Sequence, residues 1–239
     1  PTSFLPESAP ISTQGAVPLN SRPTDIPPTP TLNVENLVLR NPLTDAEQAQ
    51  LHAASLLYIS SDYYSSKATG EAINGSGYGH PSNICGPLAI AILQDGLILS
   101  NQVKPYDFWL LNPDVYADRV FLAEVFPASR FESIRNKTAL NKIDWAANPL
   151  MAGDFLYLFS GSRGNFEHML VVTRVDEAGR AYTVTNHNTE EEGFIITEEL
   201  LYDPNNPGEG LFYEWTARSK AELGSTGFEG FQLWRLKGN

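Results

Sequence analysis

The chain contains a single cysteine and few basic residues. Cys85, alone among 239 residues, excludes an intrachain disulfide and any cysteine-rich metal site. Lys and Arg total 16 against 28 Asp and Glu, and the resulting formal net charge of -12 argues against nucleic-acid binding, because such a surface repels phosphate. The longest uninterrupted apolar run, Leu88–Leu93, is far too short to span a bilayer. A hydrophobic content of 42% nevertheless allows a sizeable core.

Residues 1–32 differ from the remainder in composition. Eight of the 17 prolines fall in the first 30 residues, and only Glu7, Arg22 and Asp25 carry charge. Such a segment favours extended polyproline II structure. We expect an N-terminal arm, either a linker of the kind that follows a removed export signal or an arm that covers part of a cleft. Since the chain opens at Pro1 without a Met and contains no signal peptide, we expect a processed or truncated form. The expected location is secreted or cell-surface, with one domain over 33–239.

The first expected element after the arm is a helix over residues 45–58. Thr44 and Glu47 have the spacing of a capping box. Its predicted buried stripe consists of Leu51, Ala54, Leu57 and Tyr58. A Ser/Gly-rich loop over residues 65–82 follows.

The second expected helix begins at Cys85 and ends at Gln94 or Asp95, with Gly96 as its terminator. Because Leu88–Leu93 is apolar on every side, this helix should be buried all round. The segment 97–149 is predicted to be a mostly helical insertion. Its candidate helices are 105–111, 114–125, 130–136 and 140–147.

From Gly153 the hydrophobic period changes to two, which predicts antiparallel strands. Asp176–Gly179 is a hairpin turn in this pattern. Helices followed by strands indicate an α+β fold, with the central cysteine helix packed on the sheet. The expected strands cover 155–159, 168–175, 180–185, 194–197, 211–215 and 231–236.

Cys85 is the candidate nucleophile. A helix N-terminus presents unpaired N–H groups and the positive end of the macrodipole. A thiolate there is stabilised, so we expect a lowered pKa and reactivity near neutral pH. The alternative is a small buried hydrophobic side chain.

A cysteine nucleophile needs a base, and four histidines are available. His168 is the strongest candidate, because it opens a strand after a loop and should lie at a sheet end. The next strand would return Asn186 to that end by antiparallel pairing. Asn186 is therefore the expected group that orients the imidazole, with His187 and Asn188 as alternatives.

The oxyanion hole should include the backbone N–H of Cys85. Its second donor would come from the preceding loop, where Asn83, His80 and Tyr78 are the candidates. Asn83 has a second interpretation as the helix N-cap.

These segments together resemble the papain-like cysteine peptidase superfamily. Asn83-Ile-Cys-Gly-Pro87 looks like the nucleophile motif of C39-like peptidases, in which a CGP opens the central helix. Asn148–Phe159, the strand opened by His168 and the terminal Gly230–Arg235 are similar to the corresponding strands of NlpC/P60 and CHAP enzymes. Two departures are present. At the nucleophile, NlpC/P60 enzymes usually have Asp-Cys-Ser-Gly, whereas this chain has Ile84-Cys-Gly-Pro87. Gly79 stands where C39-like peptidases have the glutamine of the oxyanion hole.

The resemblance implies a papain-like cysteine hydrolase that cleaves an amide bond with a Cys85–His168–Asn186 triad. It implies no metal or organic cofactor. Its implied substrate is a cell-wall peptide of the peptidoglycan type or another extracellular peptide. Two alternatives use the same fold: an acyltransferase of the transglutaminase kind, and a catalytically inactive binding module.

Overall fold

The computed structural model describes residues 42–163, 167–189 and 191–238, so the predicted arm over 1–32 lies outside the described residues. No described helix has the length and apolarity needed to cross a membrane. The elements in chain order are α1 (Asp45–Leu56), α2 (Tyr63–Asn74), the 3-10 helix η1 (Pro81–Asn83), α3 (Cys85–Asp95), η2 (Pro105–Phe108), α4 (Tyr116–Val125), β1 (Phe131–Asn136), η3 (Leu140–Lys142), β2 (Phe155–Ser160), β3 (His168–Val171), β4 (Arg174–Val175), β5 (Ala181–Thr189), β6 (Gly193–Tyr202), α5 (Leu211–Leu223) and β7 (Phe228–Leu236).

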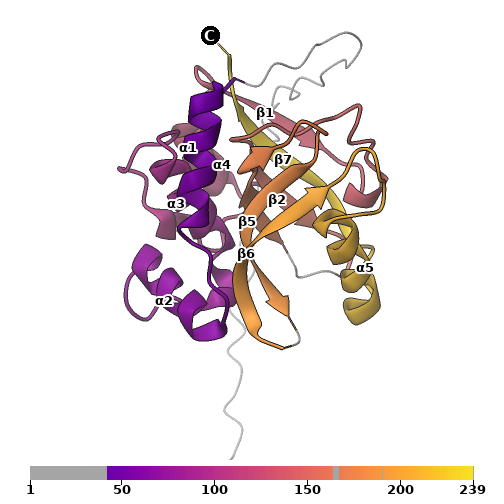
Figure 1. Ribbon diagram of the computed structural model, residues 1–239, viewed down its shortest axis with the longest axis horizontal. Helices are drawn as coiled ribbons and strands as arrows, with labels where there is room; N and C mark the ends of the chain where they lie inside the picture. The colour runs from indigo at the N-terminus through magenta and orange to yellow at the C-terminus, as the bar shows by residue number, and fades with distance from the viewer. Residues whose placement is uncertain (1–41, 164–166, 190, 239) are drawn as a thin grey trace, which may run out of the picture.

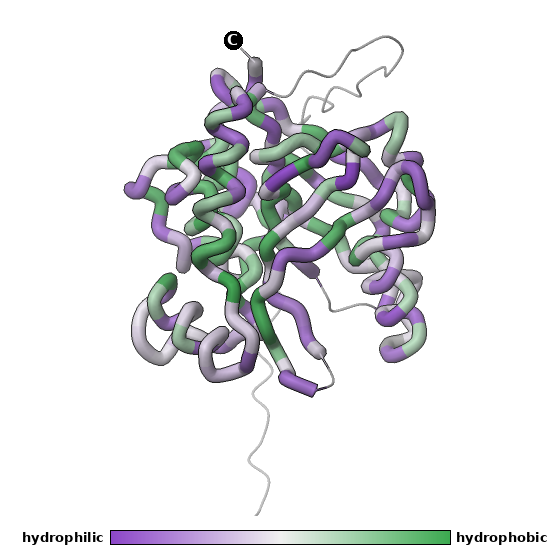
Figure 2. The backbone as a smooth tube through the Cα atoms, in the orientation of Figure 1, coloured by the Kyte–Doolittle hydropathy of each residue, from purple (hydrophilic) through white to green (hydrophobic). Residues whose placement is uncertain are grey.

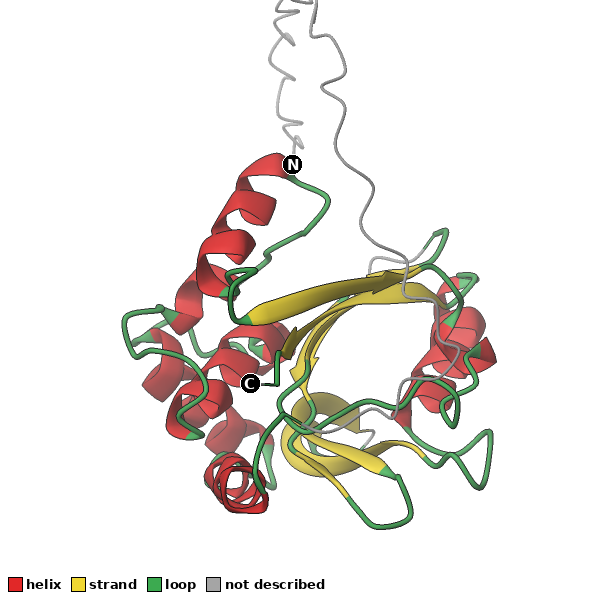
Figure 3. Cartoon of the chain, turned by 90° about the horizontal axis from the view of Figure 1, so that it is seen from above, coloured by secondary structure: helices red, strands yellow, loops and turns green. Residues whose placement is uncertain are grey.

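The strands form two antiparallel sheets between two helical layers. One sheet has the order β1-β7-β2-β3 and the other β4-β5-β6. Helices α1 to α4 lie on one side of the strands and α5 lies on the other (Figure 1; Figure 3). The predicted α+β class is confirmed.

The central strand β2 of the four-stranded sheet is buried on both faces over residues 155–158. Along β2, Phe155 and Tyr157 join the core around α3, whereas Leu156 and Leu158 join the core beneath α5. This alternation follows from the two-residue period of a strand. Hydrophobic residues accordingly concentrate along α3 and the central strands, and hydrophilic ones along the outer segments (Figure 2).

Helix α3 is the buried central helix that the sequence predicts. Its residues from Gly86 to Gln94 are buried, and Gly96 is its C-cap. A Cβ on Gly86 would lie 2.5 Å from the Phe108 carbonyl oxygen and 2.8 Å from Met169 Cε. Glycine therefore allows the first turn of α3, which carries the cysteine, to pack directly on β3.

Helix α1 has the predicted capping box. The Glu47 N–H donates to Thr44 Oγ1 over 3.3 Å, and the Thr44 N–H donates to Glu47 Oε2 over 2.7 Å. Leu51 and Ala54 are buried as expected. The prediction that Leu57 belongs to the buried stripe is wrong: its side chain is 79% exposed, because the helix ends at Leu56 and Leu57 is the C-cap.

Within the predicted loop over 65–82, the structure contains helix α2. Asp62 caps it, accepting from the Tyr64 N–H over 2.8 Å and the Ser65 N–H over 3.0 Å. The serine-rich composition concealed the helix, since Ser and Gly are weak helix formers that also suit loops.

Two further segments have the opposite secondary structure to the one expected. Residues 131–136 form strand β1, which pairs with β7, so the insertion over 97–149 is only partly helical. Residues 211–215 begin helix α5 rather than a strand. The apolar residues Leu211 and Trp215 are four positions apart, a helical spacing that a window of five residues does not distinguish from a strand. Of the expected helices over 105–111 and 140–147, only the short η2 and η3 form.

The expected strand over 168–175 is divided between the two sheets. β3 pairs with β2, whereas β4 pairs with β5. The Asp176–Gly179 turn is confirmed, with the Gly179 N–H donating to the Asp176 carbonyl over 2.9 Å. The chain therefore brings the start of β3 close to the later part of β5.

Candidate active site

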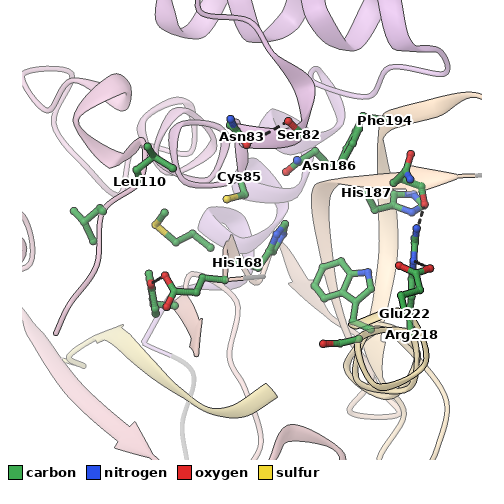
Figure 4. Close-up of a pocket in the computed structure, with 17 residues that line it drawn as sticks. Ser82, Asn83, Cys85, Leu110, His168, Asn186, His187, Phe194, Arg218 and Glu222 are labelled. Atoms are coloured by element: carbon green, nitrogen blue, oxygen red, sulfur yellow. Dashed lines mark hydrogen bonds and ion pairs between the residues drawn. The ribbon is translucent and has the colours of Figure 1, made fainter. Parts of the chain in front are cut away.

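A cleft of about 420 Å³ lies among α3, β3, β5 and α5. Cys85 and His168 both line it, and Asn83 and Asn186 lie beside Cys85 (Figure 4). His187 and Asn188 also line the cleft. The structure thus brings six of the eight residues predicted for the site into one cavity.

Cys85 is the first residue of α3 and is partly exposed. The N-cap is Ile84, without a side-chain hydrogen bond, so the interpretation of Asn83 as N-cap is wrong. Burial raises the pKa of the Cys85 thiol, and the backbone N–H groups of Met169, Gly86 and Cys85 offset only part of this effect. The expected lowering by the helix N-terminus is therefore wrong, because desolvation of the thiolate outweighs the dipole.

His168 opens β3 and is 4% exposed. Its Nε2 lies 2.8 Å from Thr185 Oγ1, and its ring packs against Trp215 with centroids 4.6 Å apart. Burial, aided by the nearby His187, lowers the pKa of His168 to about 3. The shifts of both groups favour a neutral thiol and a neutral imidazole in the unliganded protein.

Asn186 does not take the orienting position that the sequence suggested. Its Nδ2 donates to the Pro81 carbonyl over 2.7 Å, and its buried Oδ1 has no hydrogen-bond partner in the described structure. Of the predicted strand over 168–175, only β4 pairs with β5, so the expected antiparallel pairing does not extend to His168. β5 nevertheless passes beside the start of β3, where Thr185 occupies the position next to the ring. Because side chains alternate along a strand, the adjacent Asn186 faces the loop before Cys85 instead.

The two alternatives to Asn186 also make other contacts. His187 Nε2 lies 2.7 Å from Thr197 Oγ1 and 3.1 Å from Glu199 Oε1. The Asn188 carbonyl accepts from Arg218 over 3.1 Å. Both residues therefore form the far part of the cleft rather than supporting His168.

The oxyanion candidates separate into two groups. Asn83 lines the cleft beside Cys85, and its Oδ1 accepts from the Ser82 hydroxyl over 3.2 Å. His80 and Tyr78 are not cleft-lining residues. His80 contacts the Ser82 hydroxyl over 2.7 Å, and Tyr78 packs against Tyr106 and Trp109.

Several cleft-lining residues are not among those that the sequence predicts. Leu110 lies on one side of Cys85, and Arg218 and Glu222 lie on the other (Figure 4). Leu110 is 79% exposed and has φ of 58°, a left-handed conformation that is rare for a leucine. Recognising 211–223 as a helix would have placed Trp215, Arg218 and Glu222 on one face by their helical spacing. No local signal in the sequence identified Thr185 or Leu110.

One family model matches the chain. It is described as "Putative amidase domain" and matches residues 120–205, less than half of the chain. The matched segment includes His168 and Asn186 but begins after Cys85. This match supports an amidase-like domain and, more generally, a hydrolase. No curated protein and no solved structure matches the chain.

Proposed function

We propose that this protein is an exported cysteine peptidase or amidase of the papain-like kind, with Cys85 as nucleophile and His168 as base. The observation that supports it best is the meeting of these two residues in one cleft, although long separated in sequence. The amidase-like match over the histidine segment agrees with the same chemistry. The proposed substrate is a cell-wall peptide of the peptidoglycan type or another extracellular peptide.

The proposed reaction begins from neutral groups. Cys85 Sγ attacks the carbonyl carbon of the amide while its proton passes to His168. The C–N bond then breaks as the imidazolium returns this proton to the leaving nitrogen. Water next attacks the thioester with His168 as base, releasing the carboxylic acid and restoring the thiol. Because the pKa of His168 is low, the imidazole is available as a base even in mildly acidic solution.

Asn83 is the side chain best suited to complete the oxyanion hole. It precedes Cys85, lines the cleft and uses its Oδ1 for Ser82, which leaves the amide nitrogen as the donating group. This role would compensate for Gly79, which stands where C39-like peptidases have glutamine. Donors of this kind stabilise the charge that develops on the attacked carbonyl oxygen.

The proposed function is tested by incubating the protein with purified muropeptides and with unrelated peptides, and following new amino groups by mass spectrometry. We expect cleavage by the wild type and a loss of about a thousandfold or more in Cys85→Ala and His168→Ala, as for other nucleophile–base pairs. His52→Ala is the matched control, because His52 contacts Glu198 and lies outside the cleft-lining set. Cleavage that persists in Cys85→Ala would refute the proposal.

The same assay separates hydrolysis from the alternatives. With a primary amine added as acceptor, a hydrolase releases mainly the carboxylic acid, whereas an acyltransferase produces the amine adduct. Binding of muropeptides without either product would indicate an inactive binding module.

A further inference from the structure

A short polar contact between the two sheets beside the cleft joins a threonine to the proposed base. His168 Nε2 and Thr185 Oγ1 lie 2.8 Å apart, and the two residues are 4% and 1% exposed. A hydrogen bond of this length in a buried site holds both groups in fixed positions.

This contact belongs to a regular arrangement between β3 and β5. Two positions earlier on the same face of β5, the Thr183 hydroxyl donates to the Val171 carbonyl over 2.8 Å. Val171 is the last residue of β3 and His168 is the first. Threonine side chains therefore connect strands of separate sheets, and the second one contacts a ring nitrogen instead of a backbone carbonyl.

We propose that Thr185 is the positioning residue for His168, the third member of the site in place of Asn186; this inference rests on the proposed function. Its hydroxyl oxygen accepts the Nε2–H of the imidazole. In a neutral ring, a proton on Nε2 leaves Nδ1 as the basic nitrogen, so the tautomer is fixed. Trp215 packs against the ring and restricts its rotation.

The proton path through the site is then complete without any transfer to Thr185. The thiol proton of Cys85 moves to His168 Nδ1 as the bond between Sγ and the carbonyl carbon forms. The same proton moves from Nδ1 to the leaving nitrogen as the C–N bond breaks. Nε2 keeps its own proton throughout and donates it to Thr185 in both charge states.

A hydroxyl differs from a carboxylate at this position, because it orients the ring without supplying negative charge. The imidazolium therefore gains no ion pair from Thr185, which agrees with the lowered pKa of His168. The structure thus favours general-base catalysis from neutral groups over a preformed thiolate–imidazolium pair.

The test compares Thr185→Val, Thr185→Ser and Thr183→Val. Valine has nearly the shape of threonine without the hydroxyl, and serine keeps the hydroxyl. Thr183→Val is the matched control, because it removes a buried threonine hydroxyl from the same strand without touching His168. If Thr185→Val does not fold by circular dichroism, Thr185→Ala replaces it.

The first readout is the imidazole 15N spectrum, with His168 assigned by comparison with His168→Gln. We expect the Nε2–H tautomer in the wild type, in Thr185→Ser and in Thr183→Val, and a shift toward the Nδ1–H tautomer in Thr185→Val. An unchanged Nε2–H tautomer in Thr185→Val would overturn the inference. This measurement needs no substrate, so it remains decisive even if no amide is cleaved and the proposed function fails.

The second readout is the cleavage of whichever muropeptide or peptide the wild type accepts. Because the buried Nε2–H loses its acceptor and the tautomer is no longer fixed, kcat should fall about tenfold to a hundredfold in Thr185→Val. KM should change little, because Thr185 is not a cleft-lining residue. Thr185→Ser and Thr183→Val should retain most of the rate. Equal kcat in wild type and Thr185→Val would contradict the positioning role, while leaving Cys85 and His168 as the catalytic pair.

Discussion

The two walls of the cleft are built in different ways. The cysteine wall is one continuous stretch, Pro81–Asp95, which contains η1 and α3. The histidine wall is assembled from β3, β5 and α5, which are separate in the sequence and belong to different layers. The position of the cysteine wall therefore depends on the geometry of α3 and on the close contact of Gly86 with Phe108 and Met169. A wall made from three segments depends on the sheets that hold them in register.

The largest expected effect concerns the sheet beneath the histidine wall. Asp154, 1% exposed, accepts from Arg235 over 2.8 and 2.6 Å and so joins the start of β2 to β7. Asp154→Asn leaves a buried guanidinium without its counter-charge. We expect the free energy of unfolding, measured in urea, to fall by about 3–5 kcal/mol.

Asp114→Asn is the matched control for this substitution, because Asp114 forms a 2.7 Å ion pair with Arg135 at the surface. An exposed pair contributes about 0–1 kcal/mol. If the free energy of unfolding fell equally in both variants, the buried Asp154–Arg235 pair would contribute no more to stability than a surface ion pair.

The second effect is a loss of stability in acid that arises from His168 in the histidine wall. The unfolded chain protonates His168 near its ordinary pKa of 6.5, whereas the folded protein resists protonation until about pH 3. This stability is complete above pH 6.5 and is lost progressively as the pH falls toward 3. At pH 4.5 the loss amounts to about 3 kcal/mol, at about 1.4 kcal/mol per pH unit.

His168→Gln should remove this part of the acid destabilisation, measured as the change in Tm between pH 7 and pH 4.5. His80→Gln, at an exposed histidine outside the cleft lining, should behave as the wild type. An identical acid response in wild type and His168→Gln would argue against a buried neutral imidazole.

The smallest expected effect concerns the cysteine wall. Gly86→Ala places a methyl group 2.5 Å from the Phe108 carbonyl oxygen and 2.8 Å from Met169 Cε. Overpacking of this kind costs about 1–3 kcal/mol, part of it relieved by movement of the flexible Met169 side chain. We expect the added methyl group to push α3, and Cys85 with it, away from β3. The cleavage rate should therefore fall by more than the loss of stability alone would cause.

Gly238→Ala is the control, because no atom lies within 4 Å of the added methyl group. If Gly86→Ala were as stable and as active as Gly238→Ala, the close packing of α3 on β3 would not determine the position of Cys85.

Much of the fold was predictable where the sequence pattern was long and regular. The capping box of α1, the all-round apolar surface of α3 and the turn at Asp176–Gly179 have local causes, and each is present. Short or composition-biased segments gave wrong predictions. α2 was concealed by serine and glycine, and β1 and α5 were assigned from windows too short to distinguish the two periods.

The cysteine wall was predictable from the sequence, because a thiol at the first residue of an all-round apolar helix is a local pattern. The base that opens a later strand was also predictable, but its neighbour depends on how the two sheets pack. Asn186 and Thr185 are adjacent in sequence, and a one-residue difference in a strand exchanges the faces on which side chains lie. The tertiary structure also decided the sign of the pKa shift at Cys85, because desolvation depends on everything that packs around the thiol. Local geometry fixes where a chain presents a chemical group, and its protonation and partners follow from segments that only folding brings together.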